Sequence, residues 1–295
     1  MKDIIVILGP TAVGKTKLSV ELAKKIDAEI INGDSMQVYK GMNIGTAKIT
    51  TKEKENIPHH LFDIVDTSVN YTIYDYQRDC RALIKEILSR GKKVIIVGGT
   101  GLYIKAALYN YIFKKQTTSN NYDNLTNMEI LAKINEYKVK TEIHPNNRKR
   151  LVRLLNKLEN NEEPTFQKDE LLYDASFIAL TTPRENLYNK INNRVDEMFK
   201  NNLLEEVNSL KNKYKESKAL QSAIGYKEFI PYFNKEISIE KVKENIKKNS
   251  RHYAKRQYTF FIHQFNATWF ETDYNNFENT VNEVYSYISN NNKKI

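Results

Sequence analysis

A glycine-rich segment near the N-terminus is the first part of the chain that could carry chemistry. The phosphate-loop pattern G-x-x-x-x-G-K-[ST] is matched by Gly9, Pro10, Thr11, Ala12, Val13, Gly14, Lys15 and Thr16. In such a loop the backbone N–H groups surround a phosphate group, the lysine supplies a cation, and the last hydroxyl can hold Mg²⁺. The segment therefore predicts a diphosphate or nucleotide site, with Thr16 as the metal ligand.

The chain lacks other residues that a hydrolysing nucleotide switch needs. The apolar run 93–97 ends in Gly98-Gly99-Thr100, where a P-loop hydrolase usually carries a carboxylate for Mg²⁺. No Asn-Lys-x-Asp segment is present to favour guanine. The lack of these two features disfavours a motor protein or a GTPase. It favours an enzyme whose loop holds a phosphate group that is transferred or leaves.

Asp34 is the candidate for proton transfer. It closes the second apolar run, 28–31, and the carboxyl ends of strands face the ligand in open α/β folds. A carboxylate there can accept a proton from an attacking nucleophile, although a loop or capping aspartate is the alternative. The following stretch, 35–48, is too polar and turn-rich for a core.

The elements that must position these residues alternate between strand and helix patterns. Strands are predicted over 3–8, 28–31, 61–65, 93–97, 175–180 and 267–270, and helices over 15–26, 74–89, 184–200, 238–264 and 275–289. This order is typical of a parallel sheet with right-handed crossovers. We predict an α/β fold with a P-loop NTPase-like, kinase-like core over 1–112 and 173–295. Polar helical stretches interrupt it over 113–172, which we interpret as a small helical insertion domain that contacts RNA.

The composition limits the partners. Among 295 residues, 46 are Lys or Arg and 36 are Asp or Glu, a net charge of +10. This surplus favours a polyanionic partner, although a lysine-rich background is the alternative. The single cysteine, Cys80, excludes an internal disulfide framework, and no apolar run approaches the ~18 residues of a membrane span. We expect a cytoplasmic protein with no membrane partner, and nothing demands more than a monomer.

Several motifs in fixed order resemble those of the tRNA dimethylallyltransferases, also called tRNA isopentenyltransferases or the IPP transferase family. They are Gly9–Thr16, Asp34–Tyr39, Gly45–Lys48, Pro58–Leu61, Gly98–Tyr103, Ile143–Asn146, Ile224–Glu228 and Lys255–Gln257. The resemblance implies transfer of a dimethylallyl group from dimethylallyl diphosphate to N6 of the adenosine on the 3′ side of the tRNA anticodon. It also implies that diphosphate is released, with Mg²⁺ as the cofactor and the anticodon stem-loop as the partner.

The resemblance also implies roles for individual residues. Asp34 would be the general base, Lys15 and Arg194 would contact the diphosphate, and Thr100 would contact the substrate adenosine. The tRNA-binding set would comprise Asp34, Ser35, Met36, Gln37, Thr100, Lys149, Arg150, Leu151, Val152, Arg153, Gln221, Ser222, Ala223, Ile224, Gly225, Tyr226, Lys255, Arg256 and Gln257. The alternatives are a helix N-cap for Thr100 and a solvated helix position for Arg194.

Two basic clusters, 148–153 and 247–258, agree with an RNA partner. His59-His60 is interpreted as structural, because adjacent histidines point apart and no third ligand lies at metal-site spacing. The chain departs from the family pattern in a shortened insertion, in Leu154-Leu155-Asn156 after Arg153, and in Phe260 where Trp is usual. These departures concern tRNA affinity more than reaction type. The competing hypotheses are a small-molecule P-loop kinase and an RNA-binding protein that senses a nucleotide.

Overall fold

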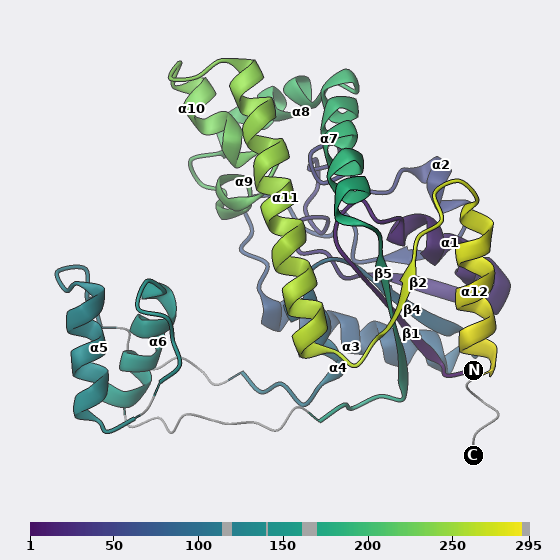
Figure 1. Ribbon diagram of the computed structural model, residues 1–295, viewed down its shortest axis with the longest axis horizontal. Helices are drawn as coiled ribbons and strands as arrows, with labels where there is room; N and C mark the ends of the chain where they lie inside the picture. Colours follow the sequence, from purple (N-terminus) through teal and green to yellow (C-terminus); the bar gives the residue numbers. More distant parts are fainter. Residues whose placement is uncertain (114–119, 140, 161–169, 291–295) are drawn as a thin grey trace. The chain divides into compact units, whose positions relative to one another are not determined.

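The computed structural model describes residues 1–113, 120–139, 141–160 and 170–290 (Figure 1). It divides into two compact units, one formed by Met1–Tyr109 and Leu171–Ile295 and the other by Asn110–Glu170. The sequence placed these borders at 112/113 and 172/173. Contact of the insertion with tRNA stays a prediction.

A six-stranded parallel sheet, counted over the described residues, forms the centre of the larger unit in the order β3-β2-β4-β1-β5-β6. Its strands are β1 (Ile4–Leu8), β2 (Ala28–Asn32), β3 (His59–His60), β4 (Lys93–Val97), β5 (Ala175–Thr181) and β6 (Thr268–Glu271). β1 and β2 are buried along their whole length, as expected when helices cover both faces of a sheet. The predicted α/β fold with a parallel sheet core is confirmed.

The third strand differs from its prediction over 61–65. β3 comprises only His59–His60, because the chain turns directly after it: Leu61 and Asp63 adopt positive φ values of 62° and 54°. Val65 forms only an isolated bridge with Tyr39. Leu61, Phe62 and Val65 therefore pack into the core from a loop, whereas Ile64 is exposed.

Helices cover the two faces of the sheet (Figure 1). Ile5, Ile7 and their neighbours pack against α1 (Lys15–Ile26) and α12 (Phe277–Asn290), whereas Ile4, Val6 and Leu8 pack on the opposite side. The other helical segments of this unit are α2 (Thr51–Lys54), α3 (Ile73–Ser89), α4 (Gly101–Leu108), α7 (Arg184–Lys200), α8 (Leu203–Ser209), η1 (Lys211–Lys213), α9 (Lys218–Ser222), η2 (Lys227–Phe229), α10 (Ile230–Phe233) and α11 (Ile239–Gln264). None of the helices in the described ranges combines the length and the apolar character needed to cross a membrane.

The smaller unit contains two helices, α5 (Asn127–Glu136) and α6 (Arg148–Glu159), within its described residues. Ile130, Ile134, Leu151 and Leu155 form its core and are fully buried. Arg148 supports this core, because its guanidinium donates to the carbonyl oxygens of Tyr122 and Leu125. The apolar side of each helix thus packs against the other helix, and the polar sides remain exposed.

Candidate active site

A cavity of about 740 Å³ lies where β1, β2 and β4 end. The residues that follow these strands line it, together with side chains from α7 and α11. They include Thr11–Thr16, Asp34–Gln37, Thr46, Thr100, Arg194, Ser222–Ile224, Tyr253, Arg256 and Gln257. Most residues of the predicted catalytic and diphosphate sites therefore surround one space at the carboxyl edge of the sheet, where open α/β folds bind ligands.

The phosphate loop connects β1 to α1 in a tight curve. Gly9 and Gly14 have φ values of 139° and 97°, which L side chains rarely adopt. A Cβ on Gly9 would also come within 2.7 Å of the Leu180 carbonyl oxygen. Lys15 is folded back over the loop, and its Nζ donates to the Pro10 carbonyl oxygen at 2.8 Å. Thr16 is exposed in the first turn of α1.

Two cations at this cavity have no anionic partner among the described residues. Desolvation lowers the pKa of Lys15 to about 8, with Asp34 opposing the shift and Arg194 adding to it. Arg194 donates to neutral oxygens only, to Thr11 Oγ1 at 3.1 Å and to the Thr46 carbonyl at 3.2 Å, while its buried Nε has no partner. Desolvation also lowers the pKa of Arg194. Because an unpaired buried cation is costly, the site favours an anion.

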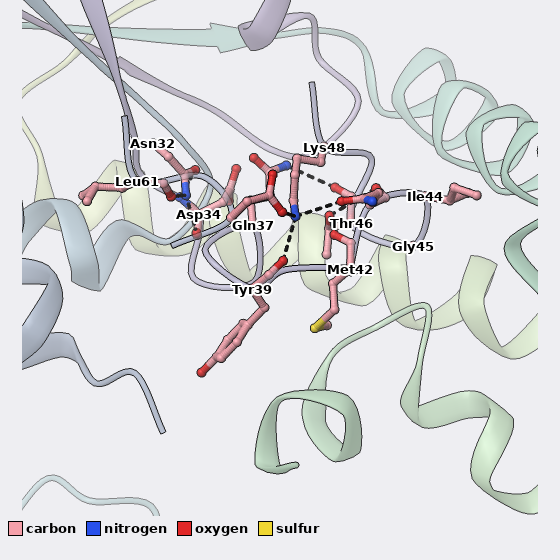
Figure 2. Close-up of polar contacts among 12 residues, drawn as sticks. Asn32, Asp34, Gln37, Tyr39, Met42, Ile44, Gly45, Thr46, Lys48 and Leu61 are labelled. Carbon is pink, nitrogen blue, oxygen red and sulfur yellow. Dashed lines mark hydrogen bonds and ion pairs between the residues drawn. The ribbon is translucent and has the colours of Figure 1, made fainter. Parts of the chain in front are cut away.

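Asp34 lies two residues beyond the end of β2 and contacts Asn32, the last residue of that strand (Figure 2). Its N–H donates to Asn32 Oδ1 at 2.9 Å, and the Asn32 amide donates back to the Asp34 carbonyl oxygen at 2.9 Å. The Gly99 N–H donates to Asp34 Oδ1 at 2.7 Å. Oδ2 has no partner in the part of the chain that the structure describes, so one carboxylate oxygen is fixed and the other makes no hydrogen bond, while Asp34 lines the cavity.

Thr100 occupies the N-cap position of α4, as the alternative interpretation predicted, but its side chain makes no capping hydrogen bond. Its hydroxyl oxygen accepts the Ser35 N–H at 3.0 Å and donates to Ser35 Oγ at 3.2 Å. This pair joins the loop after β4 to the loop after β2. Thr100 therefore lies beside the Asp34 loop and lines the same cavity.

Gln257 has a structural role that its sequence context does not predict. It was predicted to contact tRNA, yet it is only 4% exposed. Its Oε1 accepts the Thr11 N–H at 2.9 Å and its Nε2 donates to the Gly99 carbonyl oxygen at 3.0 Å. Gln257 thus links the phosphate loop to the residue that holds Asp34. A single sequence carries no signal for such a link, because α11 and the loop are 246 positions apart.

The predicted tRNA-binding residues separate by exposure. Lys149, Arg150 and Arg153 are exposed on α6, as are Lys255 and Arg256 on α11 and Gln221 and Ser222 near the cavity, whereas Ile224 is half-buried and Gly225 is buried. Leu151 and Tyr226 are 0% exposed and Ala223 is 3% exposed. Val152 packs against the core of the small unit. Leu151, Ala223, Gly225 and Tyr226 are buried and therefore have no surface to offer a tRNA.

The second basic cluster is also divided by the packing of α11. Lys247 pairs with Asp196 at 2.7 Å, and Arg251 donates to Asn192 Oδ1 at 2.6 Å. Lys248, Lys255 and Arg256 are exposed. The first two cations therefore hold α11 on α7, and the other three remain available to a polyanion.

His59 and His60 make separate contacts. His59 Nδ1 lies 2.7 Å from the Ile57 carbonyl oxygen, and His60 Nε2 lies 2.7 Å from Glu29 Oε2, which also pairs with Arg90. Burial lowers the pKa of His59. Over the described ranges, no three His, Cys, Asp or Glu residues are grouped closely enough to hold a metal ion together.

Comparisons with known proteins identify the family of this chain. A family model described as IPP transferase matches residues 37–264. The chain is 45% identical to the tRNA dimethylallyltransferase of Anoxybacillus flavithermus, over 97% of this chain and 96% of that protein. It is 43% identical to that of Bacillus subtilis, over 98% and 97%.

Solved structures give the same result. The tRNA isopentenylpyrophosphate transferase of Bacillus halodurans has a TM-score of 0.78 and 38% identity, with 98% of this chain and 96% of that chain covered. A eukaryotic dimethylallyltransferase described as acting on tRNA has a TM-score of 0.79 and 31% identity, with 98% and 80% covered.

Proposed function

Because this chain belongs to the IPP transferase family, whose members transfer a dimethylallyl group to tRNA, we propose that the cavity performs this transfer on one particular adenosine. The group would come from dimethylallyl diphosphate and go to N6 of the adenosine on the 3′ side of the anticodon. One observation carries the proposal. Two unpaired cations, Lys15 and Arg194, line the same cavity as the free carboxylate oxygen of Asp34.

The proposed reaction forms one bond and breaks another. The N6 amine attacks C1 of the dimethylallyl group, and the bond from C1 to the diphosphate oxygen breaks. The lone pair of this amine is delocalised into the adenine ring, so the N6 proton must leave as the new bond forms. Asp34 Oδ2 accepts that proton, while the Gly99 N–H holds Oδ1 in place.

The departing diphosphate gains negative charge, which the loop is built to stabilise. Lys15, Arg194 and the loop N–H groups would act on this charge as it develops. The Thr11 N–H is already bound to Gln257, so the donors of the later loop residues carry this part. The donor set also fits Mg²⁺, since the exposed Thr16 hydroxyl would stand beside diphosphate oxygens and water. We propose that Thr16 holds this ion, which when bound supplies further positive charge to the leaving group.

The substrate base must leave the anticodon stack to reach Asp34. We propose that Ser35, Met36, Gln37 and Thr100 surround the extruded adenine, because they line the cavity next to Asp34. The exposed cations of α6 and α11 would contact tRNA phosphates, with Ser222 and Ile224 at the cavity rim and the exposed Gln221 next to Ser222. A monomeric state and a cytoplasmic location stay predictions.

Incubation with labelled dimethylallyl diphosphate, Mg²⁺ and total tRNA tests the proposal. We expect label in N6-(dimethylallyl)adenosine after the tRNA is digested to nucleosides. A parallel reaction with labelled ATP and nucleosides, without RNA, tests the competing kinase hypothesis. Label on another nucleoside would contradict the proposed target, and phosphorylation without RNA would favour the kinase.

Arg150→Ala and Arg153→Ala should each weaken tRNA binding without affecting the small substrate. Both residues are exposed on α6, and each lost phosphate contact should lower the slope of log K against log salt by roughly one unit. We expect the KM for tRNA to rise and that for dimethylallyl diphosphate to stay unchanged. Lys133→Ala, which removes an exposed lysine of α5, is the matched control. An unchanged salt slope in both arginine variants would assign them to the protein surface alone.

Binding of dimethylallyl diphosphate should depend on pH through Lys15. Its pKa in the free protein is about 8, so the ammonium is present below that pH and is lost as the pH rises through it. Because a bound anion favours the charged form, affinity should be constant below about pH 8 and fall towards tenfold per pH unit above it. Direct binding measurements from pH 7 to pH 9.5 test this. The fall should vanish in Lys15→Ala, and a flat wild-type profile would contradict it.

A further inference from the structure

We infer that Lys48 is a positioning residue for the diphosphate: it fixes the segment Tyr39–Lys48, whose Thr46 carbonyl oxygen orients Arg194. The inference rests on the proposed contact between Arg194 and the diphosphate. Lys48 itself makes no part of the proposed reaction. It acts at one remove, through the backbone that carries Thr46.

Lys48 is a buried lysine whose Nζ has three partners (Figure 2). Nζ donates to the Tyr39 carbonyl oxygen at 2.7 Å, to Asn43 Oδ1 at 3.0 Å and to Asp63 Oδ1 at 2.5 Å. Its side chain is 4% exposed, whereas that of Asp63 is 45% exposed. Burial lowers the pKa of Lys48, while Asp63 counteracts this effect. The Lys48 ammonium therefore connects the beginning of the segment at Tyr39, its middle at Asn43, and the turn after β3 at Asp63.

Gly45, Thr46 and Ala47 of this segment line the cavity, and the Thr46 carbonyl oxygen contacts Arg194. The Thr46 oxygen accepts from Arg194 Nη2 at 3.2 Å and from Gln37 Nε2 at 3.1 Å. The other end of the same guanidinium donates to Thr11 Oγ1 in the phosphate loop. Thr46 lies two residues before Lys48, and its hydroxyl donates to the Met42 carbonyl oxygen at 2.7 Å. The position of the Arg194 fork thus depends on a segment that Lys48 holds closed.

Glu206 holds a different part of the segment from the part that Lys48 holds. The Glu206 carboxylate accepts the N–H groups of Asn43, Ile44 and Gly45, at distances between 2.8 and 3.1 Å. The Tyr226 hydroxyl donates to the same carboxylate at 2.6 Å. These bonds hold the outer turn, yet none of them reaches Tyr39 or Asp63. Only the Lys48 ammonium, among the described residues, joins the Tyr39 carbonyl, Asn43 and Asp63.

A double-mutant cycle between Lys48→Met and Arg194→Ala separates positioning from a general loss of stability. Methionine keeps the length and apolar stem of lysine but donates no hydrogen bond, and the half-exposed Asp63 remains solvated. Arg194→Ala should lower the affinity for inorganic pyrophosphate with Mg²⁺ at least about tenfold, as for loss of a charge-assisted contact. Lys48→Met should lower it about five- to tenfold, because the guanidinium remains but is less well placed.

In the double variant, we expect pyrophosphate affinity within twofold of that of Arg194→Ala, since coupled residues are not additive. Lys40→Met, an exposed lysine in the same segment, is the matched control and should bind as the wild type does. If Lys48→Met does not fold, judged by its thermal unfolding, Asp63→Ala removes one of the three partners from the exposed side and should act in the same direction.

The outcomes distinguish the two claims. If Arg194→Ala weakens pyrophosphate binding and the two effects multiply, Lys48 is only structural and the inference is overturned. If Arg194→Ala leaves binding unchanged, the proposed diphosphate contact fails, and the role of Lys48 fails with it. If Lys48→Met binds pyrophosphate as tightly as Lys40→Met does, the segment needs no support from Lys48.

Discussion

Asp34→Asn should slow dimethylallyl transfer by about 10²–10⁴-fold, the usual contribution of a positioned general base. Asparagine keeps the shape of the side chain, and its oxygen can still accept the Gly99 N–H. The amide cannot take the N6 proton from adenine. Because the carboxylate would act after both substrates have bound, affinity for tRNA and for dimethylallyl diphosphate should change little.

Single-turnover transfer, with both binding constants measured on the same protein, checks this expectation. Raising the pH should not restore the variant, since water cannot replace a base held by Asn32 and Gly99 inside the cavity. Asp66→Asn, which changes an aspartate outside the cavity lining, is the control. Transfer at the wild-type rate would make Asp34 structural. Loss of tRNA binding would make it a recognition residue.

Lys15→Ala should lower kcat by about 100-fold or more, the scale expected when one group that stabilises developing charge is removed. The ammonium lies over the loop and donates to the Pro10 carbonyl oxygen, and among the described residues it forms no ion pair with a carboxylate. Removing it should therefore leave no unpaired anion in the fold. We expect a small effect on the melting temperature and a large one on the chemical step.

Rates of single-turnover transfer at saturating substrate measure this loss. Lys25→Ala, later on the same helix, removes a lysine that does not line the cavity and should retain wild-type activity. Activity of Lys15→Ala within threefold of the wild type would contradict the proposed role of the loop. A matching collapse of the melting temperature would indicate that Lys15 supports the fold instead.

The sequence predicted those parts of the site that short local patterns encode. The phosphate loop, α1 and β4 lie where their patterns placed them, because glycine spacing and continuous apolar runs act within a few residues. Asp34 reached the cavity for the same reason, as it directly follows a buried strand. Local sequence patterns are therefore sufficient to predict which residues follow a strand and enter the loops around the cavity.

Long-range contacts set the remainder, and no local pattern carries them. The turn at Leu61 and Asp63 shortened β3, since Lys48 and Asn32 bind this stretch from far along the chain. The family motif Lys255–Gln257 assigned Gln257 to tRNA contact, whereas its side-chain amide joins Thr11 to Gly99. Leu151 stood in the most basic segment and still faces the core, because helical periodicity and not charge determines its direction.

The chain segments that leave the larger unit and return to it are hydrogen-bonded to each other. Tyr109 and Leu171 form an antiparallel bridge, and the Leu172 N–H donates to the Leu108 carbonyl oxygen at 2.9 Å. The residues between them have a core of their own. The two ends of the insertion therefore lie on hydrogen-bonded neighbouring segments. An insertion of any length has to span only the distance between them. An insertion of another length could therefore be joined to Tyr109 and Leu171 without altering the strands that carry the cavity.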